Sequence, residues 1–190
     1  MQEKLNLEEQ KILLRLAREA MERGVRGEEI PPLELDFLPT CLREDGSSFI
    51  TLTLRGQLRG CIGALEAYQP LAQDVREHAV AAALKDPRFP PVKEDELSGI
   101  QIEVSRLTCP APLEYSDSND LLSQLRPHVD GVVLYDDLYH RATFLPQVWE
   151  KIPDCEEFLN NLCYKMGLEP DLWRRKHFEV FTYQVEGFHE

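Results

Sequence analysis

Arg59 and Cys61 stand two residues apart in the segment Leu58–Gly63, whose neighbours are typical of a β-strand. Side chains alternate between the two faces of a strand, so Arg59 and Cys61 are expected on one face, about 7 Å apart. Leu58 and Ile62 are expected on the other face. A guanidinium near a thiol lowers the pKa of the thiol and favours the nucleophilic thiolate. The spacing therefore indicates nucleophilic or redox chemistry at Cys61.

A structural role for the same residues stays open. Cysteine is often buried as a small hydrophobic side chain, and Arg59 could form an ion pair that holds the fold together. Gly60 and Gly63 lack side chains, so they leave room for a close backbone, a bulge or a ligand. The segment is a candidate site whose glycines have either a binding or a packing role.

His78 is the candidate general base for Cys61, because a cysteine nucleophile commonly has an imidazole beside it. It stands in a helical pattern that begins after Pro70 and can fold back over the preceding strand. The alternative is a histidine held by hydrogen bonds within the core, as most buried polar groups are.

Three further polar residues are candidates for ligand binding. Asp86 and Arg88 lie in a stiff segment that contains three prolines, and Glu103 lies on the polar side of a predicted strand. Together with Arg59 they would form a cleft of carboxylates and guanidinium groups that orients an anionic or polar ligand. Structural salt bridges explain the same residues equally well. The sequence contains no P-loop, dinucleotide-binding glycine pattern, H-E-x-x-H motif or serine nucleophile elbow.

The sequence resembles the AMMECR1 domain family along nearly its whole length. The resemblance rests on blocks in the same order: Leu58–Gly63 (LRGCIG), Phe49–Leu52, Asp86–Val92, Ile102–Ser105, Asp130–Val132, Leu145–Val148, Glu157–Leu159 and Lys165–Leu168. It implies an α+β fold and an association with Memo-like and radical-SAM proteins, and it leaves any cofactor unspecified. An intracellular enzyme or enzyme subunit that uses the Arg59 and Cys61 cleft is the leading hypothesis. The alternative is a non-catalytic binding or adaptor domain for a protein or RNA partner.

The elements that position these residues follow from local patterns. A capping box at Asn6 begins a helix that Gly24 is expected to end, and Asp154 caps another that ends at Gly167. Short hairpins separated from helices favour α+β over a parallel sheet. The expected fold is one domain of residues 1–190 in two closely packed lobes, about 1–112 and 113–190, with a mainly antiparallel, open or barrel-like sheet flanked by helices.

Composition restricts the classes of function. The chain has 21 Lys and Arg against 34 Asp and Glu, a formal net charge of −13, which disfavours broad binding to nucleic acid or to anionic lipid. It has no apolar run near the length of about 20 residues that a membrane span needs. Five cysteines without C-x-x-C spacing indicate neither disulfides nor a structural zinc site. We therefore expect a cytoplasmic protein with reduced thiols and no bound metal.

Overall fold

The computed structural model describes residues 4–136 and 140–190, which form two compact units. Residues 1–108 and 186–190 make up the first unit, and residues 109–185 make up the second. The sequence placed the chain end in the second lobe, but the last strand returns to the first unit, where Glu190 donates a backbone hydrogen bond to Ile102. Within the described residues, no helix is long and apolar enough to cross a membrane.

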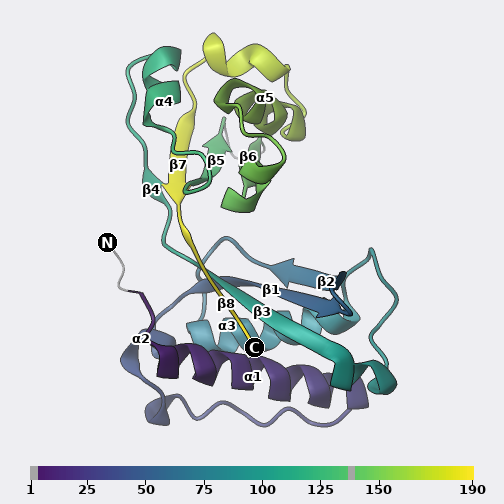
Figure 1. Cartoon of the computed structure of the whole chain (residues 1–190). Coiled ribbons are helices and arrows are strands. Elements are labelled where there is room, and N and C mark those ends of the chain that lie inside the picture. Colours follow the sequence, from purple (N-terminus) through teal and green to yellow (C-terminus); the bar gives the residue numbers. More distant parts are fainter. Residues whose placement is uncertain (1–3, 137–139) are drawn as a thin grey trace. The chain divides into compact units, whose positions relative to one another are not determined.

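The first unit packs helices on one face of an antiparallel sheet (Figure 1). Its strands lie in the order β2-β1-β3-β8. Its elements are α1 (Leu7–Arg26), η1 (Leu35–Phe37), α2 (Thr40–Arg43), β1 (Ser47–Leu54), β2 (Gln57–Gly63), α3 (Leu71–Leu84), η2 (Glu94–Gly99), β3 (Ile100–Leu107) and β8 (Val185–His189). Helices α1 and α3 cover one face, and that face carries the buried residues Ile50, Leu52, Ile102 and Val104.

Helix α1 begins as expected and ends later than expected. The Asn6 side chain accepts hydrogen bonds from the backbone N–H groups of Glu8 and Glu9, and Glu9 completes the capping box. The helix continues through Gly24 and ends at Gly27, whose φ of 69° is left-handed and suits glycine. A Cβ at Gly24 would lie 3.0 Å from Val80 on α3, so this glycine permits close packing of the two helices.

The second unit has its own sheet and its own core. The strand order is β4-β7-β5-β6, and the elements are β4 (Ala111–Pro112), α4 (Ser118–Gln124), β5 (Gly131–Tyr135), β6 (Arg141–Phe144), η3 (Pro146–Glu150), α5 (Cys155–Lys165), η4 (Pro170–Arg174) and β7 (Glu179–Tyr183). Trp149 and Phe158 stack in the core with ring centroids 3.6 Å apart, and Trp149 donates to the Asp130 carbonyl. Asp154 caps α5 as expected, and Cys163 is fully buried in this core.

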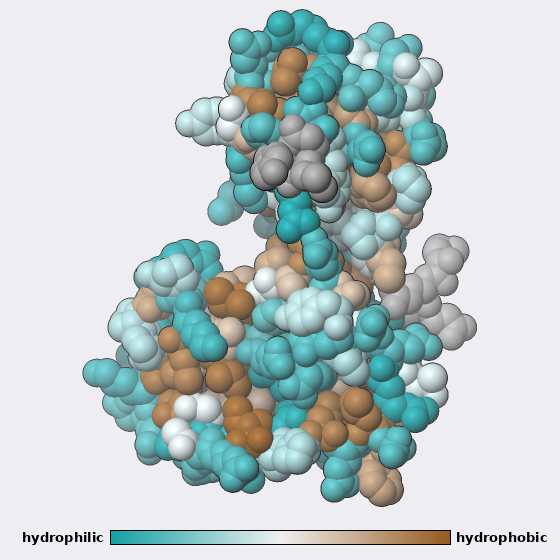
Figure 2. Space-filling view, turned by 180° about the vertical axis from the view of Figure 1, so that it is seen from behind, coloured by the Kyte–Doolittle hydropathy of each residue, from teal (hydrophilic) through white to brown (hydrophobic). Residues whose placement is uncertain are grey.

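Both units confirm the α+β class, and neither sheet closes into a barrel. The strand pairs β1–β2, β1–β3, β4–β7, β5–β6 and β5–β7 are antiparallel. Most of the surface seen from behind is hydrophilic, and hydrophobic residues gather in separate patches (Figure 2).

Candidate functional site

A β-bulge changes the expected arrangement of the signature segment. In the β1–β2 pairing, Leu52 lies opposite Gly60 and Thr53 opposite Leu58, so Arg59 has no partner on β1. The extra residue breaks the alternation of side chains. The expectation that Leu58 shares a face with Ile62, rather than with Cys61, is therefore wrong. Leu58 is 45% exposed on the face away from the helices.

Arg59 is held by the neighbouring segment. Its Nε and Nη2 donate to the two carboxylate oxygens of Glu96 on η2 at 2.8 and 2.9 Å. Nη1 and Nη2 also donate to the carbonyl oxygens of Pro90 and Pro91 at 2.8 and 3.2 Å. A bidentate pair of this kind fixes both partners, so Arg59 fastens the proline-rich segment to the edge of the sheet. This is the structural role that the sequence left open.

The Arg59 pair gives a pH-dependent contribution to stability. Its hydrogen bonds are the main cause that lowers the pKa of Glu96 from 4.5 to about 2. Because the pKa is lower in the folded state, the contribution is fully present above pH 4.5 and is lost as the pH falls to about 2. We expect the pair to add about 1–3 kcal/mol to the free energy of unfolding. Solvent screens the pair only partly, because the Glu96 side chain is only 20% exposed.

We therefore expect Glu96→Gln to lower the free energy of unfolding by about 1–3 kcal/mol at pH 7 and by progressively less below pH 4.5. Urea unfolding at several pH values measures this difference from the wild type. Glu94→Gln is the matched control, because Glu94 is exposed on the same short helix. A loss that stays constant from pH 7 to pH 2 would show that the Glu96 charge is not responsible.

Asp86 and Arg88 fix the backbone of Cys61. The Asp86 carboxylate accepts from the Cys61 N–H at 2.8 Å and from the Arg88 backbone N–H, Nε and Nη2 at 3.1, 3.0 and 2.7 Å. Arg88 Nη2 also donates to the Cys61 carbonyl at 3.2 Å. The Arg88 hydrogen bonds are the main reason that the pKa of Asp86 lies far below its usual range. Side chains thus form hydrogen bonds with both the N–H and the carbonyl of Cys61, which lies on the edge strand β2.

The cation beside the Cys61 thiol is Arg88. The pKa of Arg88 is raised chiefly by its hydrogen bonds with Asp86, and the Cys61 side chain adds a charge interaction and a hydrogen bond. On the other side, the Thr51 hydroxyl donates to Cys61 Sγ at 3.4 Å. Cys61 itself is half-buried, and the Arg88 side chain is 54% exposed. The Arg88 guanidinium and the Thr51 hydroxyl are thus polar groups that interact with the Cys61 side chain.

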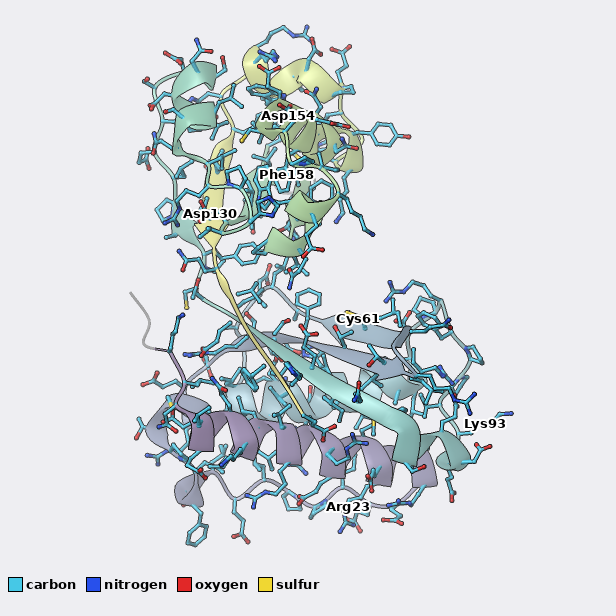
Figure 3. The ribbon with its side chains drawn as sticks, in the orientation of Figure 1. Arg23, Cys61, Lys93, Asp130, Asp154 and Phe158 are labelled. Atoms are coloured by element: carbon cyan, nitrogen blue, oxygen red, sulfur yellow. The ribbon has the colours of Figure 1, made fainter. Side chains whose placement is uncertain are left out.

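Glu103 shares the open face of the sheet with Cys61. Thr51 lies opposite Cys61 on one side and opposite Glu103 on the other, so the three residues form a row across β2, β1 and β3. Two strand spacings separate Cys61 from Glu103, about 10 Å. Figure 3 shows Cys61 on the side of the sheet away from α1 and α3. At this separation the side chains of Cys61 and Glu103 do not meet directly.

His78 lies on the opposite side of the sheet from Cys61. Its Nδ1 is 3.1 Å from Oδ2 of Asp74, one turn earlier on α3, and the same oxygen accepts a hydrogen bond from Ser48 at 2.6 Å. Helix α3 packs on the covered face, whereas Cys61 points from the open face. The structure therefore does not bring His78 and Cys61 together.

The space beside the two signature glycines is filled by protein. A Cβ at Gly60 would lie 2.1 Å from the Ala82 carbonyl oxygen on α3, and one at Gly63 would lie 2.4 Å from the Ser48 carbonyl oxygen. Of the alternatives that the sequence left open for these glycines, the structure shows close approach of the backbone.

Sequence reasoning missed Glu96, Thr51 and Asp74. The spacing of Asp74 and His78, four residues apart on a helix, was a usable signal for their contact. Glu96 and Thr51 meet their partners only through the sheet and its edge, so no local pattern marks them. Within residues 4–136 and 140–190, no group of three or more His, Cys, Asp or Glu is placed to hold a metal ion.

The chain is an α+β protein in which a thiol, a guanidinium and a buried carboxylate lie at the edge of an antiparallel sheet. The sequence matches the AMMECR1 family over residues 14–188. The chain belongs to the AMMECR1 family.

Similar proteins are known from archaea. A protein of Methanothermobacter thermautotrophicus is 42% identical over 191 residues, which cover 98% of this chain and 96% of that protein. Protein MJ0810 of Methanocaldococcus jannaschii is 35% identical over 193 residues, covering 98% and 92%. The crystal structure of the uncharacterized protein PH0010 from Pyrococcus horikoshii has a TM-score of 0.84 and 34% identity, covering 98% of this chain and 93% of that one. The structural match confirms the α+β fold.

Proposed function

We propose that the protein is an intracellular enzyme or enzyme subunit in which Cys61 is the reactive thiol. The observation that carries the proposal is the Asp86 and Arg88 pair, which holds the backbone of Cys61 on both sides and places a guanidinium beside its sulfur. The active cation is therefore Arg88, in place of the Arg59 that the spacing indicated.

The other thiols are less suited to nucleophilic chemistry. Burial is the main cause that raises the pKa of Cys41, to about 11, and it also raises the pKa of Cys155 and Cys163. These three groups stay protonated at neutral pH, and a protonated thiol is a poor nucleophile. Cys109 is exposed. At Cys61, in contrast, the Asp86 and Arg88 side chains hold both the backbone N–H and the backbone carbonyl.

The open face around Cys61 supplies the contacts for a substrate. Arg88 is half-exposed, and the Thr51 and Glu103 row extends from the thiol across the sheet. These groups suit a polar substrate that the Arg88 cation orients toward the sulfur. Memo-like and radical-SAM proteins are the partners that we propose, on the basis of the family resemblance.

Alkylation of the thiol tests the role of Arg88. In a Cys109→Ala background, we expect iodoacetamide to modify Cys61 well before Cys41, Cys155 or Cys163 between pH 6 and 9. Arg88→Gln should slow that reaction several-fold at pH 7, because the thiolate loses its cation. Rates are measured by mass spectrometry of the Cys61 peptide.

Arg55→Gln is the matched control, since Arg55 is exposed at the turn of the same hairpin. Equal rates in the Arg88 and Arg55 variants would refute activation by Arg88. A Cys61 that resists alkylation throughout this pH range would count against thiol chemistry altogether.

Complementation of a deletion strain then distinguishes the enzyme hypothesis from the hypothesis of a non-catalytic adaptor domain. A Cys61→Ala variant with a normal melting temperature should fail to complement a strain that lacks the gene. If the stable variant complements fully, the thiol is not catalytic, and a non-catalytic binding or adaptor domain is the better account.

A further inference from the structure

A cavity of about 530 Å³ lies in the first unit, away from the Cys61 thiol. Helix α3, the segment Ile30–Pro32 and the side chain of Ile62 line it, and its apolar wall also includes Val80 and Ala81. Sites for small molecules are typically about 300–1,000 Å³ and mostly apolar, with a few polar groups that orient the ligand. The cavity meets both conditions, since Arg76, His78 and Lys85 also line it.

Arg76 is a buried cation whose hydrogen bonds go to neutral groups. It is only 8% exposed, and its Nη2 and Nη1 donate to the Pro31 carbonyl and, at 3.4 Å, to Gln73. Burial is the main cause that lowers its pKa, although the charges of Glu19 and Glu77 oppose the shift. Among the described residues, no carboxylate forms an ion pair with Arg76. Because a buried guanidinium is costly unless it is paired, a bound anion that contacts Arg76 directly would stabilise it more than the distant carboxylates of Glu19 and Glu77 do.

The remaining charged side chains at the cavity are Lys85, which is exposed, and Glu77. Lys85 adds a second cation, and the Glu77 carboxylate is already bound by the side-chain amides of Gln69 and Gln73 at 3.0 and 2.9 Å. His78 points its Nδ1 at the fully buried Asp74, so Nε2 is the ring nitrogen left for a ligand. The cavity thus combines two cations, one carboxylate that accepts from side-chain amides and one imidazole nitrogen with an apolar wall.

We propose that this cavity binds a small molecule with an oxyanion at one end and an apolar body. Arg76 and Lys85 bind the oxyanion, His78 Nε2 forms a hydrogen bond to it, and the body packs against the apolar wall. Carboxylates and phosphates share this chemistry. The proposal is independent of the thiol function, since Cys61 lies on the other face of the sheet.

Titration with two simple probes tests the site. Hexanoate and hexyl phosphate are added to the full chain at low salt, while the His78 ring signals are followed by NMR and assigned with a His78→Gln variant. We expect saturable binding of at least one anion, and the tighter of the two identifies the carboxylate or phosphate class. Hexanol should bind at least about tenfold more weakly, because it lacks the charge. The proposal is overturned if neither anion saturates, or if hexanol binds equally well.

Variants locate the binding. Arg76→Gln should weaken binding of the preferred anion about tenfold or more, whereas the exposed Arg43→Gln should leave it unchanged. Lys85→Gln should also weaken binding, and it leaves the buried Arg76 guanidinium in place. This variant tests the site even if Arg76→Gln does not fold. Ala81→Phe should abolish binding by filling the cavity. Binding that survives Ala81→Phe, or that responds equally to the Lys85 and Arg43 changes, would rule the cavity out.

Discussion

Replacing Gly60 with alanine is expected to lower the free energy of unfolding by about 3 kcal/mol or more. The added Cβ would lie 2.1 Å from the Ala82 carbonyl oxygen, a distance that real structures do not show. The obstructing atom belongs to the backbone of α3, so no side-chain rotation relieves the contact. Strand β2 and helix α3 would have to move apart, which opens the core of the first unit.

The control for Gly60 is Gly187→Ala in the same sheet. Gly187 lies on β8, and a Cβ there would meet only Glu103 Oε1, at 3.7 Å. The control should change stability by no more than about 0.5 kcal/mol, as surface substitutions usually do. Chemical denaturation of both variants measures the effect. Similar small losses at the two positions would show that the strand and helix separate at little cost.

The elements of this fold could largely be predicted from local patterns. The capping box at Asn6, the cap at Asp154 and the α+β class depend on residues close together in the sequence, so their signals are readable. The end of α1 was placed wrongly at Gly24, because glycine marks helix ends in general and here serves contact with Val80. That contact joins two helices, and no local pattern reveals it.

Sequence reasoning named several residues that the structure places together, but it did not predict which of them contact one another. Cys61, Asp86 and Arg88 lie together as a mixed cluster, but the bulge at Arg59 shifts the register of the strand. Arg59 then pairs with Glu96, which is 37 residues away in the chain. A bulge depends on how β1 and β2 pair, and the sequence of either strand alone does not specify it.

Replacing Asp86 with alanine is expected to lower the free energy of unfolding by about 2–4 kcal/mol at neutral pH. The carboxylate is almost completely buried and accepts four hydrogen bonds, one from the Cys61 backbone and three from Arg88. Removal leaves these donors without their acceptor. Because Arg88 is half-exposed, its guanidinium can return to water, so the loss is smaller than for a fully buried pair.

The pH dependence of the Asp86 effect identifies its origin. The pKa of Asp86 is lowered, chiefly by Arg88, from 3.8 in the absence of interactions. The ionised carboxylate therefore stabilises the fold fully above pH 3.8, and this contribution declines as the pH falls toward the lower folded-state value. The difference in the free energy of unfolding between the wild type and Asp86→Ala should be constant from pH 7 to pH 5 and should decrease below about pH 4.

Asp95→Ala is the control, since Asp95 is an exposed carboxylate in the nearby η2 segment. Urea unfolding at pH 7 should give a clearly lower free energy of unfolding for Asp86→Ala than for Asp95→Ala. The Asp86 variant should also lose the selective alkylation of Cys61, because the carboxylate that positions Arg88 and binds the Cys61 N–H is gone. If Asp86→Ala is destabilised but alkylates at the wild-type rate, the carboxylate supports the fold alone. Such a result would remove the physical basis for assigning Arg88 to the thiol.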